Sequence, residues 1–147
     1  VAQALGQYAR YESVLPLHLS ELAILVTARY FSSGFEWKQH APIALIAGIP
    51  EQAVSAIANA QRFSFEDPKM QAVFDFSVDL HGDRFVSDTS YNKALELLGQ
   101  HACIDLVGVC GYYTFISMTI NVFDVPDGEG LDLPRSIIQC ARLFQSS

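Results

Sequence analysis

The chain has 147 residues, of which half are hydrophobic, and it carries a formal net charge of −7 with a mean hydropathy of +0.22. This length predicts a single domain with a substantial core. Its acidic balance and scattered Lys and Arg lead us to expect neither nucleic acid nor a membrane as a partner, because both attract cationic side chains. A composition this apolar predicts that further hydrophobic surface is buried between identical subunits, and we therefore expect a homo-oligomer.

Apolar residues recur mostly at spacings of three and four, which is typical of helices, and no run of two-residue alternation predicts a strand. We therefore predict one all-α domain over residues 1–147. Gly48 and Gly99 mark helix ends, whereas Asp67 followed by Pro68 marks a helix start. The expected helices cover residues 2–12, 17–32, 35–47, 50 onward, 68–81, 87–98 and 101–123, with a short docking helix at 137–144.

The long helix at 101–123 contains an uncharged run from 106 to 123, which is long enough to raise the question of a membrane span. Tyr, Thr, Ser and Asn side chains interrupt this run. Its flanks, Asp105 and Asp124, are acidic where a span usually has Lys or Arg. A helix buried on all sides in an oligomer core is the better interpretation.

Cys103, Cys110 and Cys140 form no CxxC pair, which predicts reduced thiols and a cytoplasmic protein rather than a disulfide scaffold or a zinc site. We expect Cys103 and Cys110 to be small core residues. The start of the chain does not have the pattern of a signal peptide. Because it opens on Val1 rather than Met, we expect a processed or truncated N-terminus.

Glu21, Glu36 and His40 are the candidate catalytic residues. Glu36 and His40 are four residues apart on one predicted helix, so they share a face and can hydrogen-bond. A carboxylate beside a histidine raises its proton affinity, as general acid/base chemistry requires. From the residues alone, a surface Glu–His pair and a Glu21 that satisfies a helix dipole are the more frequent interpretations of these positions.

Two segments resemble the carboxymuconolactone decarboxylase/alkylhydroperoxidase-D superfamily: SELAILVTARYFSSGFEWKQHAPIALIAGIP and YNKALELLGQHACIDLVGVCGYYTFISMTINVF. The resemblance covers about residues 15–125 and implies a compact AhpD-like fold of six to seven helices that forms trimers or hexamers. Aligned on His40 and Gly48, Glu21 falls on the family's proton-relay glutamate and His40 on its histidine. Ser33 and Glu36 stand where the redox cysteine pair would be.

This departure removes the thiol chemistry of the peroxidase branch, because serine and glutamate cannot form the disulfide. The decarboxylase branch, as the resemblance implies, needs neither cysteine, nor metal, nor organic cofactor. We expect His40 to donate the proton, tuned by Glu21 or Glu36. The candidate substrate-pocket residues are Ser33, Trp37, Tyr112 and Tyr113.

The preferred function is a cofactor-free lyase that acts on a small organic acid or lactone by acid/base chemistry. An alkylhydroperoxidase-like antioxidant protein and a non-catalytic helical ligand-binding module are the alternatives. For a carboxylate substrate, the nearest cationic side chains in the sequence are Arg29, Lys38 and Arg62. The sequence does not decide which of them faces a pocket.

Overall fold

The computed structural model describes residues 2–133 and Phe144, and over this part of the chain it contains seven α-helices, one π-helical segment and no strand. The all-α prediction is therefore confirmed. The predicted helix at 137–144 and Cys140 lie outside the described residues, apart from Phe144. The elements are α1 (Ala2–Gln7), η1 (Tyr8–Glu12), α2 (Leu17–Tyr30), α3 (Gly34–Ile46), α4 (Glu51–Ala58), α5 (Pro68–Gly82), α6 (Asp88–Leu98) and α7 (Gln100–Val122).

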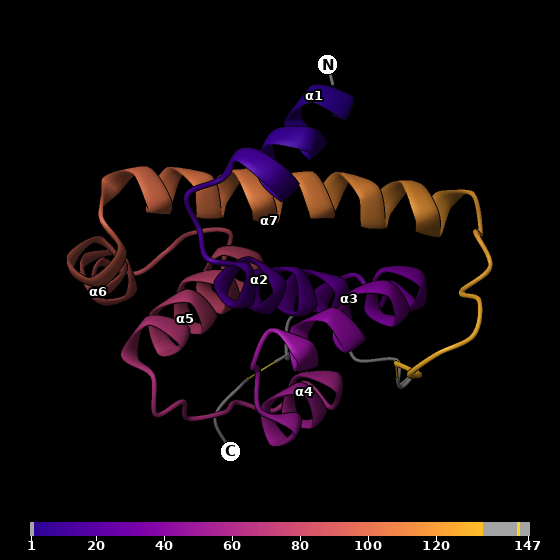
Figure 1. The fold of residues 1–147 in the computed structure, drawn as a ribbon, viewed down its shortest axis with the longest axis horizontal. Coiled ribbons are helices and arrows are strands. Elements are labelled where there is room, and N and C mark those ends of the chain that lie inside the picture. The colour runs from indigo at the N-terminus through magenta and orange to yellow at the C-terminus, as the bar shows by residue number, and fades with distance from the viewer. Residues whose placement is uncertain (1, 134–143, 145–147) are drawn as a thin grey trace.

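Helix α2 is the centre of the domain. Every residue from 21 to 30 is buried, because α3, α5 and α7 all pack against this helix. Figure 1 shows α7 running across the width of the molecule, with α1 on one side of it and α2 on the other. The residues of α2 are apolar nearly all round, as expected of a helix enclosed by its neighbours.

Helix ends follow the predicted local signals. The Asp67 side chain accepts a hydrogen bond from the Lys69 amide at 2.8 Å, and Ser87 Oγ accepts one from the Ser90 amide at 3.2 Å. These N-caps satisfy amide groups that have no partner within the helix. Gly48 lies just beyond α3 with a φ of +102°, a left-handed conformation that glycine adopts without steric cost.

The first predicted helix differs from the observed one. Instead of one α-helix over 2–12, α1 gives way to the π-helical segment η1, which closes with the Ser13 amide bonded to the Tyr8 carbonyl at 2.9 Å. The wider turn coincides with a tertiary anchor on α7 that no local sequence signal encodes.

That anchor is the buried carboxylate of Asp105. It accepts hydrogen bonds from the Val14 amide at 2.7 Å, Tyr8 Oη at 2.9 Å and Ser13 Oγ at 2.9 Å. Burial alone raises the pKa of Asp105, but these three donors outweigh it and hold the pKa below its ordinary value. One side chain of α7 thus holds the whole N-terminal segment in place.

Helix α7 is buried on only one side. Its exposed side carries an apolar stripe whose members are separated by three, eight, three and four residues: Ile104, Val107, Phe115, Met118 and Val122. By length and composition the helix could cross a membrane, yet the face with Leu106, Val109 and Tyr113 is part of the core. The described structure is compatible with a soluble protein. The predicted burial of α7 on all sides does not occur within a single chain, because one side of the helix is exposed.

Replacing Asp105 with Asn tests the anchor. An amide oxygen cannot accept from all three donors, so Asp105→Asn is expected to lower the free energy of unfolding by about 2 kcal/mol and to speed proteolysis within residues 2–14. Urea unfolding and limited proteolysis measure the two effects. Asp83→Asn, the same change at an exposed position, is expected to cost less than about 0.5 kcal/mol. Equal effects from both variants contradict the anchor.

Candidate functional site

A tight turn between α2 and α3 assembles the site. Ser32 adopts a left-handed φ of +48°, and the Ser33 amide donates to the Ala28 carbonyl at 2.9 Å. These two features terminate α2. Asn121 of α7 donates from Nδ2 to the Phe31 carbonyl at 2.7 Å and holds the turn against α7. Helix α3 consequently packs alongside α2, and His40 comes to face Glu21.

His40 lies between two carboxylates. Its Nδ1 is 2.8 Å from Glu21 Oε2 and its Nε2 is 3.2 Å from Glu36 Oε2. All three side chains are buried, each residue with 5% of its surface exposed. The structure therefore brings together the three predicted catalytic residues, including Glu21, which reaches His40 from a different helix.

The surroundings of His40 stabilise its protonated form. Burial lowers the pKa of the imidazole, but the hydrogen bonds to Glu21 and Glu36, together with their charges, outweigh burial and raise this pKa from 6.5 to about 9. At neutral pH both ring nitrogens therefore carry protons and donate to the two carboxylates. Because the cluster is buried, removal of the imidazolium would leave two carboxylates without a positive charge beside them.

An aromatic wall supplied by α7 covers the imidazole. The Tyr113 ring meets the His40 ring edge to face, with centroids 4.9 Å apart and an angle of 87°. Tyr112 packs against Tyr113 at 5.2 Å. Gly6 of α1 lies so close to Tyr112 that a Cβ at this glycine would stand 2.4 Å from the ring. The N-terminal segment thus fixes the position of one wall of the site.

A cavity of about 310 Å³ opens beside His40. Of the predicted site residues, Glu36, His40, Tyr112 and Tyr113 line it, and Glu21 lies behind His40. Ser33 and Trp37 are buried in the core and do not line it, although both were predicted pocket residues. The lining is completed by Phe35, Gln39 and Ile116.

Sequence reasoning missed these three residues, although a signal for two of them was present. Phe35 and Gln39 are four residues apart and share a face of α3 that adjoins the face of Glu36 and His40, so the helical period could have included them. Ile116 follows Tyr112 by one turn of α7, but the face of α7 that meets α3 depends on tertiary packing.

Among the described residues, no Lys or Arg lines this cavity. Lys38 donates to the Gly128 carbonyl at 2.7 Å and pairs with Asp132 at 3.0 Å, so the loop after α7 holds it. Arg62 pairs with Asp75 and lies over the Phe74 ring. Arg29 is fully buried on α2. The three cations considered for a carboxylate substrate therefore all lie elsewhere.

The described cysteines are unsuited to redox chemistry. Cys103 and Cys110 are free and buried, as expected of core residues. Burial raises the pKa of the Cys103 thiol, and it raises the pKa of Cys110 to about 11. A thiol of this kind is protonated at neutral pH and is a poor nucleophile toward peroxides.

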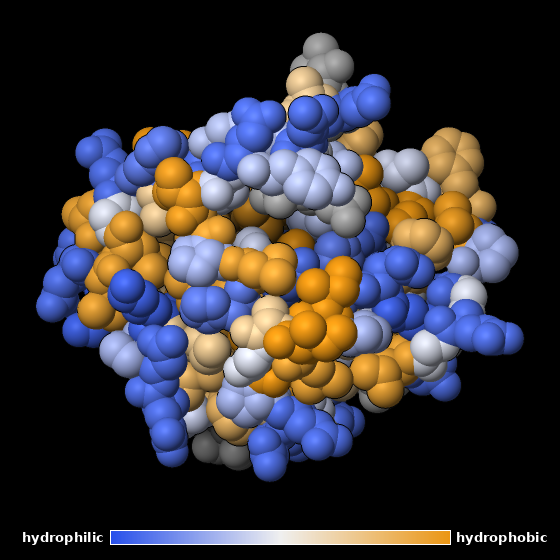
Figure 2. All heavy atoms as spheres, viewed as in Figure 1, coloured by the Kyte–Doolittle hydropathy of each residue, from blue (hydrophilic) through white to orange (hydrophobic). Residues whose placement is uncertain are grey.

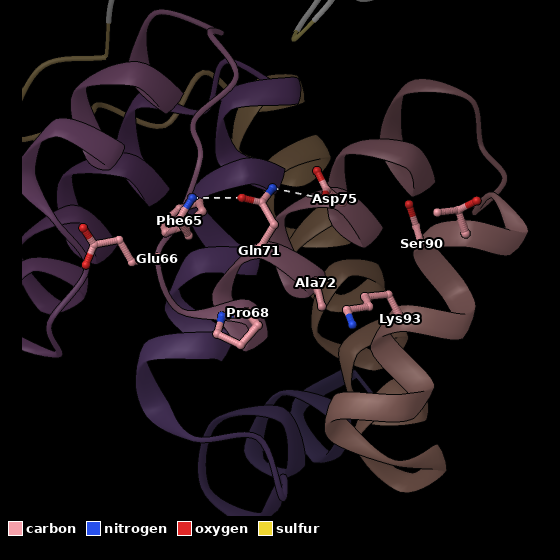
Figure 3. Close-up of a pocket in the computed structure, with 9 residues that line it drawn as sticks. Phe65, Glu66, Pro68, Gln71, Ala72, Asp75, Ser90 and Lys93 are labelled. Carbon is pink, nitrogen blue, oxygen red and sulfur yellow. Dashed lines mark hydrogen bonds between the residues drawn. The ribbon is translucent and has the colours of Figure 1, made fainter.

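A second cavity, of about 290 Å³, lies between α5, α6 and the segment that precedes α5. Figure 3 shows that Gln71 bridges the Phe65 amide and Asp75, opposite Ser90 and Lys93 of α6. The polar side chains of Gln71 and Asp75 are engaged in hydrogen bonds within the protein, so they serve to hold α5 and the preceding segment together. None of the predicted site residues lines it.

Comparisons with known protein families, with curated proteins and with solved structures found no match. The superfamily resemblance therefore rests on the sequence segments quoted above, and a function must be inferred from the geometry of the cavity. Within the described residues, no group of three His, Cys, Asp or Glu side chains is placed to hold a metal ion.

The raised pKa of His40 links its protonation to stability. The folded protein binds this proton more tightly than the unfolded chain, so the stabilisation is complete below pH 6.5 and is lost as the pH rises through about 9. The difference in unfolding free energy between the wild type and His40→Gln is expected to shrink by on the order of 3 kcal/mol between pH 6 and pH 10. Urea unfolding across this range measures it, with His18→Gln as the matched control. A difference that does not change with pH contradicts the assignment.

Proposed function

We propose that this protein is a cofactor-free lyase, similar to carboxymuconolactone decarboxylases, that moves a proton to or from a carbon atom of a small lactone. One observation carries the proposal: the imidazole of His40 is held at both nitrogens by buried carboxylates, beside a cavity of about 310 Å³. A histidine fixed in this way has a defined orientation and a defined proton position, as general acid/base catalysis requires.

The three residues have distinct roles in this proposal. Glu36 and His40 line the cavity and exchange the proton with the substrate, whereas Glu21 orients His40 from behind through Nδ1. In a ring-opening elimination of a lactone whose ring oxygen is attached to the second carbon from the carbonyl, the proton on the carbon next to the carbonyl passes to Glu36. Its electron pair forms the new double bond while the ring C–O bond breaks, and the product leaves as an unsaturated carboxylate.

A lactone suits the cavity better than a free acid. The part of the lining that the structure describes has no Lys or Arg to neutralise a carboxylate, and Glu36 would repel one. The same repulsion favours release of the carboxylate product after elimination. The tyrosine pair and Phe35 supply apolar walls against which a small ring packs.

The two alternatives have less support. An alkylhydroperoxidase-like protein needs a reactive thiol, and both described cysteines are buried and protonated. A non-catalytic ligand-binding module needs no buried imidazolium between two carboxylates, which is a costly arrangement in a purely structural role.

Self-association through α7 is part of the proposal, as is a cytoplasmic location. The apolar stripe follows one face of α7, at spacings that are multiples or near-multiples of a helical turn, and lies on the helix that carries Tyr112 and Tyr113. Figure 2 shows further hydrophobic patches between hydrophilic side chains on the viewed face. A homo-oligomer, a trimer or hexamer as the resemblance implies, would bury such surface.

Deuterium incorporation tests the proposed chemistry without knowledge of the natural substrate. A panel of small lactones is incubated with the protein in D₂O, and NMR follows exchange at the carbon next to the carbonyl. The wild type is expected to accelerate exchange of at least one lactone, and His40→Gln to lower that rate about 100-fold, whereas His18→Gln leaves it unchanged. No acceleration across the panel contradicts the proposal. So does hydroperoxide turnover that requires a dithiol and is abolished by thiol alkylation.

Light scattering after size-exclusion chromatography tests the assembly. The wild type is expected to be oligomeric and Phe115→Glu, in the middle of the α7 stripe, to dissociate it, because a charge would be buried at the interface. Phe85→Glu is the matched control, since Phe85 is also exposed but lies after α5. A monomeric wild type, or dissociation by Phe85→Glu alone, contradicts this part of the proposal.

A further inference from the structure

The charge balance of the cavity beside His40 is negative. Glu21 and Glu36 contribute two carboxylates, and the imidazolium of His40 contributes one positive charge. Glu21 lies behind the imidazole and does not line the cavity, so the Glu21–His40 pair is neutral when seen from the cavity. The carboxylate of Glu36, which does line it, is the charge that remains.

Among the described residues, no other group in the lining offsets this charge. The other described members are Phe35, Gln39, Tyr112, Tyr113 and Ile116, and none of them is a basic residue. Lys38, two residues after Glu36, is committed to Gly128 and Asp132. Glu21 and Glu36 share a single imidazolium, and in a buried site the net negative charge that remains attracts a cation more strongly than it would at the surface.

Aromatic rings form much of the rest of the wall. Phe35, Tyr112 and Tyr113 line the cavity, and the two tyrosine rings meet edge to face at 5.2 Å. The face of an aromatic ring attracts ammonium groups, and rings of this kind beside a carboxylate are a recurrent way to bind organic cations. An apolar cavity of about 150 Å³ holds benzene, so the space here is sufficient for a small ring with a substituent.

From the Glu36 carboxylate, the three aromatic rings and the absence of a Lys or Arg among the described lining residues, we infer that this cavity binds a small organic molecule bearing an ammonium group. The ammonium lies against Glu36 and the tyrosine pair, and the rest of the molecule occupies the apolar part of the cavity. The inference rests on the proposed function in one respect: it specifies the substrate of the proposed lyase as a lactone that also carries an amine.

Three probes of equal size and different charge test the inference: benzylamine, benzyl alcohol and benzoate. Their affinities for the full-length protein at pH 7 are measured by isothermal titration calorimetry, and chemical-shift changes in the Tyr112 and Tyr113 rings report the place of binding. Benzylamine is expected to bind about tenfold more tightly than benzyl alcohol, and benzoate more weakly than both. Tightest binding by benzoate, or affinity that does not depend on charge, overturns the inference.

Two variants identify the charge responsible. Glu36→Gln is expected to remove the preference for benzylamine over benzyl alcohol. Glu96→Gln, the same substitution at an exposed position on α6, keeps it. Should Glu36→Gln not fold, the order of affinities in the wild type still decides the inference. Binding is measured without turnover, so the two proposals can fail separately. A preference for benzylamine together with no lactone exchange would support the ligand class and contradict the lyase. Lactone exchange together with tightest binding of benzoate would support the lyase and contradict the ligand class.

Discussion

The sharing of one imidazole by two buried carboxylates is the constraint on which the site depends. His40 can satisfy Glu21 and Glu36 together only as an imidazolium, and it can reach Glu21 only if α3 folds back along α2. The left-handed Ser32 and the Asn121 contact to the turn supply that geometry from two sides. Packing, charge and the proposed chemistry thus depend on one cluster, and loss of His40 leaves two buried carboxylates without a positive partner in it.

Local rules predicted the helices well, because the features involved lie within a few residues of one another. The apolar period gave the helical segments, and Asp67, Ser87 and the glycines gave their ends. The Glu36–His40 pair followed from four-residue spacing on one helix. The π-helical turn of η1 could not be predicted, since its partner, Asp105, is more than 90 residues away in the sequence.

The composition of the cavity was less predictable, because it depends on which faces meet. Glu21 could be related to His40 only through the superfamily resemblance, since nothing local links α2 to α3. Trp37 lies next to Glu36 in the sequence, but one residue turns a helical side chain by about 100°, and it enters the core. The position of Lys38 could not be predicted either, because its partners Gly128 and Asp132 lie in a loop that is distant in the sequence.

The protonation of His40 at both nitrogens is the central claim, and ¹⁵N NMR of the imidazole tests it most directly. Both ring nitrogens are expected to carry protons at pH 7, with a single titration as the pH rises through about 9. His81, whose pKa burial lowers to about 4, serves as an internal reference that stays neutral over the same range. A His40 ring with one unprotonated nitrogen at pH 7, or a midpoint at or below the ordinary 6.5, would contradict the account.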